Sequence, residues 1–454
     1  MLPIQSKNNQ LNLFHSPLSQ ILDMTDPLIA LANTINWNIF DKEFEKYYSN
    51  EGRPAKPIRL MVGLLLLKQL ENLSDENIIL QWKRNPYYQY FCGLDELQII
   101  EPCHSTELVK FRNRIGTKGM EVIFGMSVAL HGKEANEKQV IVDTTVQENN
   151  ITYPTDGKLA IKIINHLHKI AKKESIQLRR TYLKEIKGHR ISLRFFRHPK
   201  KRKKAKAAMK RLKTIAKTLI RDLDRNFNNS LHQKYAQSFY LYMRVLLQEK
   251  HTKNKIYSLH ETHAYAINKG KDHKGYEYGT KASIVTTKKS GIIIGVSAHS
   301  KNEHDSKTLE AALASAIKNT HKPIKEAICD RGYRGVKEVL DIKISIPGTV
   351  LKRDTKYQKE VKREKFRRRA SIEPIIGHLK SDHRMARNHL KGFDGDSINL
   401  LLAASAFNLK KWMNLYLYAI FIQNYTLFLE AITQLKKNAL LFQILLRIKT
   451  IFKI

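Results

Sequence analysis

Two short apolar segments, far apart in the chain, each contain an aspartate, and together they constrain the fold more than any other feature. The first is "VIVDTTV" (140–146) and the second is "KEAICD" (325–330). Both have the apolar and β-branched composition of buried strands. A carboxylate placed among such residues is costly unless the fold requires it there. We therefore expect a sheet that presents Asp143 and Asp330 as functional groups.

The segments that follow residue 276 predict the rest of this sheet. In order along the chain they are a strand at 281–287, a strand at 291–299, a helix at 306–318, the strand at 325–330, a short helix at 334–341 and a strand at 343–348. The first two strands flank "KKSG", which predicts a hairpin with Gly291 at the turn. This order predicts an α/β fold, a mixed sheet with helices on its faces. If the first and fourth strands are neighbours, Asp143 and Asp330 meet at one edge.

A third acid, Glu373, lies in "RRRASIEPIIGHLKSDHRM" (367–385), near the start of a predicted helix. Three acids brought together need a cation among them, and oxygen ligands suit Mg²⁺ or Mn²⁺. Two such ions, about 4 Å apart, can activate a water and stabilise the leaving oxygen of a phosphodiester. Any one of these acids alone is more often an ordinary turn or cap residue, so the prediction depends on the three together.

The residues around the second and third acids include candidate contacts to a phosphate backbone. Arg369, Glu373 and Lys380 share one face of a helix, and the alternative to DNA contact is a surface ion pair. Pro374 indicates that the helix begins near Glu373 or kinks there. In "DRGYRG" (330–335) two glycines permit a sharp turn, and the candidate DNA contacts there are Arg331, Tyr333 and Arg334.

Residues 1–135 read as an all-α N-terminal domain. Helices are predicted from Pro57, after the N-cap Ser74, and after Ser105, the last of them ending with Gly116. The last of these carries three cations, Lys110, Arg112 and Arg114, beside its apolar residues. A helix-turn-helix type DNA reader and a helical dimerisation bundle explain this pattern equally well.

Charge points to a polyanionic partner. The chain has 80 Lys and Arg against 42 Asp and Glu, a net charge of +38, and nucleic acid is the commonest partner of such a field. A lysine-rich ribosome-associated protein, or one from an AT-rich genome, is the alternative. Residues 151–260 form a basic, helical insertion, for which phosphate contact is favoured over a merely solvated face.

Cysteine usage and apolar runs bear on the compartment. The three cysteines, Cys92, Cys103 and Cys329, form no CxxC pair, which supports neither a disulfide framework nor a zinc site and suits a reducing cytoplasm. The N-terminal residues predict no signal peptide. The apolar stretch "LYLYAIFI" (415–422) is too short to span a bilayer, which needs about 20 residues.

The three acid motifs together resemble those of the bacterial insertion-sequence transposases with a DDE active site, in the group named for insertion sequences four and five. The matching segments are "IVDTTVQENNITYPTD", "AICDRGYRG" and "RRRASIEPIIGHLKSDHRM". The family signature of Tyr, Arg, Glu and Lys at set spacings is met by Arg369, Glu373 and Lys380, with Phe366 at the tyrosine position. The likeness covers about residues 35 to 412, and the segment "RPAKPIRLMVGLLLLKQLENLSDENIILQWKRNPYYQYFCG" resembles the family's N-terminal domain.

This resemblance implies a ribonuclease H-like catalytic domain at 136–413, with Asp143, Asp330 and Glu373 as catalytic residues that bind two divalent ions. It implies cleavage of double-stranded DNA at terminal inverted repeats, then attack of the freed 3′-hydroxyl on target DNA, without a small-molecule cofactor. Arg369 and Lys380 would contact DNA near the scissile phosphate. A homodimer that joins two element ends, and a cytoplasmic, nucleoid-associated location, follow from the same resemblance.

The tail at 414–454 matches nothing in the family pattern, and its apolar and basic spacing predicts an amphipathic packing or membrane-surface helix. Two other functions stay open on the sequence alone. One is a nuclease of the same fold that cuts without joining. The other is a DNA-binding, regulatory or inactive relative of a transposase, which would bind in a salt-sensitive way without metal-dependent cleavage.

Overall fold

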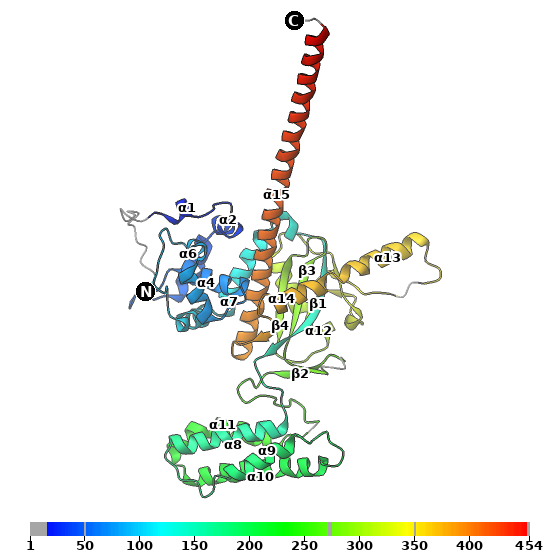
Figure 1. The fold of residues 1–454 in the computed structure, drawn as a ribbon. Helices are drawn as coiled ribbons and strands as arrows, with labels where there is room; N and C mark the ends of the chain where they lie inside the picture. The colour runs from blue at the N-terminus through cyan, green and yellow to red at the C-terminus, as the bar shows by residue number, and fades with distance from the viewer. Residues whose placement is uncertain (1–15, 50, 250, 271–274, 349–350, 452–454) are drawn as a thin grey trace.

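The computed structural model of the chain describes residues 16–49, 51–249, 251–270, 275–348 and 351–451, with side chains in the last helix described as far as residue 430. Figure 1 shows a helical N-terminal region beside a sheet, a helical insertion hanging from the sheet, and a long C-terminal helix. The N-terminal helices are α1 (Leu18–Ile21), α2 (Pro27–Thr34), α3 (Asn38–Phe44), the 3-10 turn η1 (Glu45–Tyr47), α4 (Ile58–Leu70), α5 (Asp75–Arg84), α6 (Pro86–Phe91) and α7 (Ser105–Ala129).

These helices begin close to where the sequence predicts. Ser74 caps α5 by accepting a hydrogen bond from the Asn77 amide, and Pro57 is the residue before α4. The third predicted helix differs at both ends. His104, not Ser105, is its N-cap, and Gly116 breaks the helix at a φ of 57° without ending it, so that α7 resumes and runs to Ala129. Glycine tolerates this left-handed φ, which explains why the chain can bend and continue.

One of the three cations of this segment is structural. Arg112 is buried and donates to both carboxylate oxygens of Asp75 at 2.8 and 2.6 Å, and Lys68 lies 2.8 Å from the same carboxylate. Burial raises the pKa of Asp75, but the two cations outweigh burial and lower the pKa to about 2. Breaking a buried pair of this kind costs about 3–5 kcal/mol. Arg112 therefore ties α7 to α5, whereas Lys110 and Arg114 remain exposed.

Within the described residues, eight strands form one mixed sheet. β1 is its central strand, paired antiparallel with β3 and parallel with β5, while β4 continues beyond β3 and β7 beyond β5. The first and fourth predicted strands, β1 and β5, are thus neighbours. The strands are β1 (Gln139–Asn149), β2 (Tyr265–Asn268), β3 (Tyr276–Thr287), β4 (Ile293–His299), β5 (Glu326–Ile328), β6 (Glu338–Val339), β7 (Ile342–Ser345) and β8 (Arg387–Asn388).

The predicted hairpin is present, with Gly291 at a φ of 64° between β3 and β4. The short helix predicted at 334–341 is wrong. After a 3-10 turn, η3 (Arg331–Tyr333), the chain forms β6, which pairs antiparallel with β7. Leu340 and Asp341, both with positive φ, make the two-residue turn between them, the geometry that tight hairpins need. The sequence gives no signal for this turn, because neither residue is a glycine or an asparagine.

Helices cover the sheet and carry the chain to its end. α12 (Asp305–Lys318) contacts β3 and β4, and α15 (Gly392–Ile451) lies between the sheet and the N-terminal helices. One continuous apolar core joins the N-terminal helices to the sheet. Two further helices, α13 (Lys356–Arg369) and α14 (Ile372–Ser381), precede α15, and α13 projects from the body (Figure 1).

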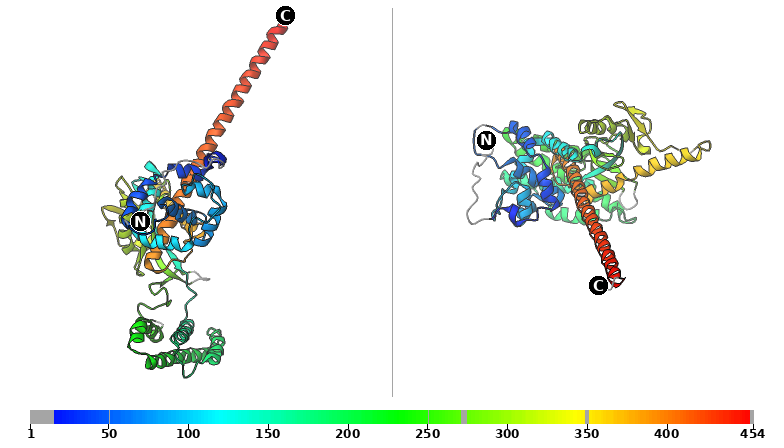
Figure 2. Two further views of the ribbon diagram at one scale, coloured as in Figure 1. Left: turned by 90° about the vertical axis from the view of Figure 1, so that its left-hand side faces the viewer. Right: turned by 90° about the horizontal axis from the view of Figure 1, so that it is seen from above.

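The last part of α15 leaves the body as a single helix (Figure 2). From residue 414 to 430 nearly every side chain is exposed, including those of Phe421 and Tyr425, which stack on each other. The predicted helix is therefore present, and Gln423, Thr426 and Glu430, spaced three and four residues apart, lie on one side of its described part. No described helix is long and apolar enough to cross a membrane.

The insertion is a separate helical module with its own core. Its helices are α8 (Asp156–Lys173), α9 (Leu183–Leu193), α10 (Arg202–Asn226) and α11 (Asn229–Leu247). Their buried residues form a cluster distinct from the main core. The predicted helical character of residues 151–260 is confirmed over the described helices. The module follows the end of β1 and returns to the sheet before β2 (Figure 1).

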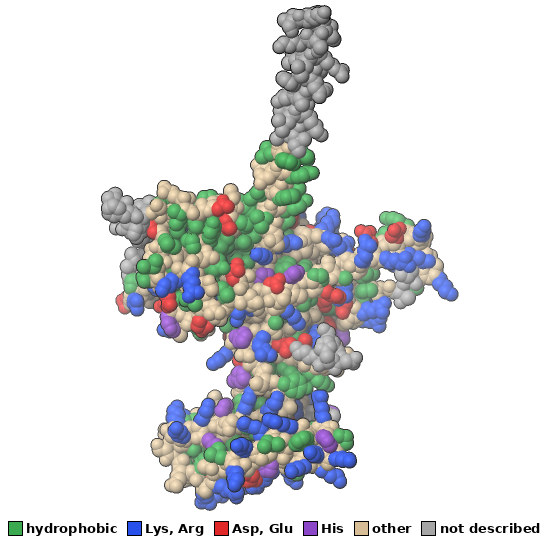
Figure 3. Space-filling model, viewed as in Figure 1, with side chains coloured by type: hydrophobic (Ala, Val, Ile, Leu, Met, Phe, Trp, Pro, Cys, Tyr) green, Lys and Arg blue, Asp and Glu red, His purple; other side chains and the backbone are tan. Residues whose placement is uncertain are grey.

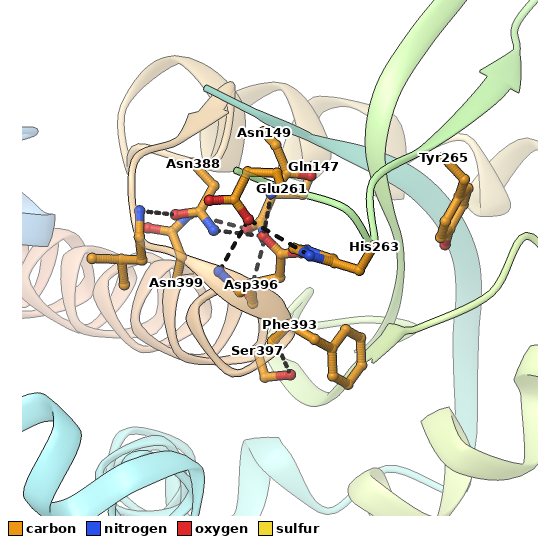
Figure 4. Close-up of polar contacts among 12 residues, drawn as sticks. Gln147, Asn149, Glu261, His263, Tyr265, Asn388, Phe393, Asp396, Ser397 and Asn399 are labelled. Carbon is orange, nitrogen blue, oxygen red and sulfur yellow. Dashed lines mark hydrogen bonds and ion pairs between the residues drawn. The ribbon is translucent and has the colours of Figure 1, made fainter. Parts of the chain in front are cut away.

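A buried polar network holds the chain where the insertion rejoins the body (Figure 4). Asp396, near the start of α15, is fully buried and lies 2.8 Å from the ring nitrogen Nε2 of His263. Its other carboxylate oxygen accepts hydrogen bonds from the amides of Asn149 on β1 and Asn388 on β8. The network thereby joins the return segment, two strands and α15 around one carboxylate.

Candidate active site

Sheet register places Asp143 and Asp330 side by side. Ile141 of β1 lies opposite Ile328 of β5 in a parallel ladder. Two residues further along each strand come Asp143 and Asp330, on the same side of the sheet because side chains alternate. The ladder ends at Ile141 and Ile328, so both acids lie just past the last paired residues of these two strands. This is the carboxyl edge of neighbouring parallel strands, where α/β proteins place functional groups.

A single arginine gathers all three predicted acids. A guanidinium nitrogen of Arg369, Nη2, lies 2.9 Å from Asp143 Oδ2 and 4.0 Å from Asp330 Oδ2. Its other terminal nitrogen, Nη1, lies 3.6 Å from Glu373 Oε1. The exposed fraction of the acidic side chains rises from 13% for Asp143 to 36% for Asp330 and 63% for Glu373. The cluster therefore runs from the sheet to the solvent.

A helix break brings Arg369 and Glu373 to this edge. Arg369 is the last residue of α13, and α14 begins at Ile372 with Pro374 in its first turn. The prediction that a helix begins near Glu373 is confirmed. Ile372, Ile375 and Leu379 are buried, so α14 is anchored by its apolar face while Glu373 stays outward. Lys380 is half-buried in the last turn of the same helix.

Burial and crowding set the electrostatics of Asp143. Burial has the largest effect and raises the pKa of Asp143 above its ordinary value, and the neighbouring charge of Asp330 adds to the rise. The Arg369 guanidinium and the Thr144 amide, which donates to Oδ1 at 2.8 Å, act in the opposite direction. One cation thus serves three carboxylates. The site retains an excess of negative charge that additional positive charge would relieve.

The donor set suits a hard divalent cation. The three side chains offer only carboxylate oxygens, the ligands preferred by Mg²⁺ and Mn²⁺. In the described part of the chain, however, no three acidic, histidine or cysteine side chains are arranged around a common point as ligands of one ion. The three acids are instead arranged around Arg369. The residues therefore fit such an ion by chemistry, with Arg369 in the position of the counter-cation.

A fourth carboxylate, Asp305, belongs to the same neighbourhood. Its Oδ2 and Asp330 Oδ1 would lie 3.1 and 2.9 Å from a Cβ added at Gly332, so both oxygens crowd that glycine. Asp305 Oδ1 accepts from the Thr144 hydroxyl at 3.1 Å and from Lys281 Nζ at 2.8 Å. Asp305 begins α12, which follows β4, a strand that runs in the same direction as β1, and this order was the signal that could have placed it at this edge.

The candidate DNA contacts near Asp330 do not all face solvent. Arg331 and Arg334 are exposed, on either side of the 3-10 turn. Tyr333 is fully buried in the main core, so its assignment as a DNA contact is corrected: the ring anchors the turn that carries Asp330. Phe366, at the position where the family has tyrosine, packs against the same core. An aromatic ring there fills space without a hydroxyl.

Two family models match the chain. One is described as "Transposase domain (DUF772)" and covers residues 16–114, and the other as "Transposase DDE domain" and covers residues 250–409. The second includes Asp330 and Glu373 and begins after the helices of the insertion. The chain is also 37% identical over 203 residues to "Uncharacterized protein ORF8 in nfe locus" of Rhizobium meliloti, which spans 44% of this chain and 98% of that protein. No solved structure matches.

Proposed function

The chain belongs to the transposases with a DDE domain, and from this premise we propose that it cuts the terminal inverted repeats of its own element and joins them to target DNA. The observation that carries the proposal is the gathering of Asp143, Asp330 and Glu373 around Arg369. Assignment to the group of insertion sequences four and five, and to the ribonuclease H-like fold, is part of the proposal. The order β4–β3–β1–β5–β7, with only β3 antiparallel among these, supports that fold.

We assign the three acids as ligands of two Mg²⁺ or Mn²⁺ ions, which supply Lewis acidity for attack on a phosphodiester. Asp143 on β1 gives the site a rigid base, since groups on sheet elements are held more firmly than groups on loops, and Asp330 lies two residues past the end of the adjacent strand β5. Glu373 approaches from α14 and is the most exposed of the three, so it can adjust when DNA arrives.

Arg369 has a second role in this proposal. With no phosphate present, its guanidinium neutralises the crowded carboxylates. Arginine also binds phosphate with two parallel hydrogen bonds. Arg369 can therefore release the carboxylates and bind the DNA phosphates beside the scissile bond. Lys380, Arg331 and Arg334 would hold the same strand. A homodimer would then bring two element ends together.

The test uses purified full-length protein and labelled duplexes that carry the inverted repeats found beside the gene, with Mg²⁺ or Mn²⁺. We expect cut ends and joined products from the natural protein. Asp143→Asn should lower both by at least about 10²-fold, the scale of a lost electrostatic contribution to the transition state, while DNA binding persists. The control is Asp394→Asn, an exposed acid in the first turn of α15, which should leave activity unchanged.

Undiminished cleavage by Asp143→Asn would refute the proposed site. Cut ends without joined products would instead identify a nuclease, and binding without any metal-dependent product from the natural protein would identify a DNA-binding protein that lacks the chemistry. Each outcome contradicts the proposal at a different step.

A further inference from the structure

The helical insertion holds much of the positive charge of the chain. Residues 151–260 contain 29 of the 80 Lys and Arg but only six of the 42 Asp and Glu. The module has a core of its own, and both family models leave its helices unmatched. Figure 3 shows Lys and Arg side chains spread over the face of the module in view. The module is thus a basic unit added to the sheet.

The few acids of the insertion are already engaged. Five of the six lie within 4.0 Å of a basic side chain, in the pairs Asp156–Lys255, Glu174–Lys234, Glu185–Arg211, Asp222–Arg179 and Asp224–His232. These pairs account for only a small part of the 29 cations. The remaining charge is therefore available to a partner outside the chain.

Six of the insertion's cations form a row along α10. One face of this helix buries residues such as Leu212, Ile215 and Leu219 in the core of the insertion. The opposite, solvent-facing side carries a row of cations spaced three, four or seven residues apart, with no acidic partner among the described residues. We call this row the α10 basic face: Lys203, Lys206, Lys210, Lys217, Arg221 and Arg225.

This row is unfavourable for the isolated helix, because like charges at i and i+4 repel by a few tenths of a kcal/mol per pair. It spans about 33 Å from Lys203 to Arg225 at 1.5 Å per residue. That length is close to one turn of duplex DNA, about 34 Å. The spacing of charge therefore suits a long, regular polyanion better than a small anion.

A hollow at one end of the row adds a more specific feature. It has a volume of about 230 Å³ and is lined by four arginines, Arg179, Arg180, Arg221 and Arg225, together with Thr218 and Asp222. Arg179 pairs with Asp222, and Arg180 with Glu185, both at 3.6 Å, which leaves Arg221 and Arg225 as the hollow's cations without an acid. Convergent guanidinium groups are a common means of holding phosphate.

We propose that the α10 basic face binds the backbone of duplex DNA outside the carboxylate site, with the arginine hollow as its phosphate-binding end. The partner is taken to be DNA because the inference rests on the proposed function. α10 lies on the side of the module away from the sheet in both side views (Figures 1 and 2). The contacted DNA is therefore a segment distant from the scissile phosphate, and the contact reads no base sequence.

The experiment measures binding of a 5′-fluorescent duplex of random sequence to full-length protein by anisotropy, across a salt series. The variant replaces Lys206, Lys210, Lys217, Arg221 and Arg225 with glutamine, which retains helix propensity. Five lost phosphate contacts should reduce the slope of log K against log salt by about 4.5, from roughly 0.9 per contact. The binding constant at low salt should fall at least tenfold.

The matched control removes five exposed cations at the edge of the sheet opposite the carboxylate site, near the starts of β1, β5 and β7. They are Lys133, Lys138, Lys322, Lys325 and Lys343. It has the same net charge as the test variant and should keep a slope near that of the natural protein. An equal change in both variants, or an unchanged slope in the test variant, would overturn the inference.

Two further variants separate binding from folding and from catalysis. Arg221→Gln with Arg225→Gln alters only exposed side chains and should reduce the slope by about two, and Arg221→Lys with Arg225→Lys should restore it. Loss of slope in the lysine pair together with loss of helical circular dichroism would contradict an electrostatic contact. Because the assay needs no cleavage, an inactive carboxylate site leaves its result intact, and the two proposals can fail independently.

Discussion

Asp305, the first residue of α12, and Asp330, two residues past the end of β5, come close together only in the folded structure, where an oxygen of each crowds Gly332. Asp305 Oδ1 receives hydrogen bonds from Lys281 and Thr144, and Thr144 directly follows Asp143. A change at Asp305 therefore reaches the neighbourhood of Asp143 through a short polar contact, and Asp305 also lies against Gly332 in the turn that follows Asp330. We regard Asp305 as a residue that positions the carboxylate cluster rather than one that touches DNA.

We expect Asp305→Asn to lower the rate of DNA cleavage by about tenfold, equal to about 1.4 kcal/mol in the barrier. The same change leaves the Lys281 ammonium, whose side chain is 11% exposed, without its anion and should cost about 1–3 kcal/mol of stability. Adding Lys281→Met removes the unpaired charge, so the double variant should regain stability but not activity. Recovery of the cleavage rate together with stability would show a purely structural role.

Among the elements, β1 makes the most connections that position the site. It is long enough to pair with β5 through its first three residues, to carry Asp143 in its middle, and to pair with β8 at its end. Its antiparallel partner β3 approaches closely at one position. A Cβ added at Gly279 would lie 2.0 Å from the carbonyl oxygen of Gln147 on β1 and 2.8 Å from the Cα of Glu148.

Gly279→Ala should therefore destabilise the body by about 3 kcal/mol, at the upper end of the usual range for overpacking, since the colliding atoms are backbone and cannot rotate away. Tryptophan fluorescence during urea unfolding measures this, because all three tryptophans, Trp37, Trp82 and Trp412, lie outside the insertion. Gly377→Ala is the control. It is helical with open space around it and should stabilise by about 0.5–1 kcal/mol. If Gly279→Ala and Gly377→Ala changed the free energy of unfolding equally, the register described for β1 and β3 would be contradicted.

Over the whole molecule, the insertion, the sheet and α15 are joined by the Asp396 network. The hydrogen bond to Asp396 is the main cause that raises the pKa of His263, and partial burial opposes it. A raised histidine pKa means that the folded state binds the proton more tightly than the unfolded state. The stabilisation is then complete below the unfolded pKa, about 6.5, and is lost as pH rises through the higher folded value.

The body should accordingly be more stable near pH 6 than near pH 9 by about 1.5 kcal/mol from this pair, the scale of a hydrogen bond to a charged group. His263→Gln removes the titrating group. The difference in unfolding free energy between the natural protein and His263→Gln, followed by tryptophan fluorescence, should shrink as pH rises. A difference that stays constant from pH 6 to 9 would show that protonation of His263 contributes nothing to this junction.

Local sequence patterns were sufficient to predict the elements whose turns and ends are set by neighbouring residues. The β3–β4 hairpin follows from a glycine turn between β-branched runs, α5 from its Ser74 cap, and the start of α14 from Pro374. The sequence was insufficient where the decisive partner was remote. β6 was taken for a helix because its pairing with β7 is tertiary and its turn lacks glycine, and Tyr333 was taken for a surface residue because nothing local reveals that its ring is covered.

The sequence by itself determined which side chains carry charge and which segments become strands and helices, because these depend on composition and on contacts within a few residues. It therefore identified Asp143, Asp330 and Glu373 as candidates and the insertion as a basic helical segment. Only the tertiary structure decided that β1 and β5 are in register, that Arg369 stands among the three acids, that Asp305 joins them, and that Arg112 and Tyr333 are buried. These facts depend on distances between residues far apart along the chain, which strand pairing and core packing fix together.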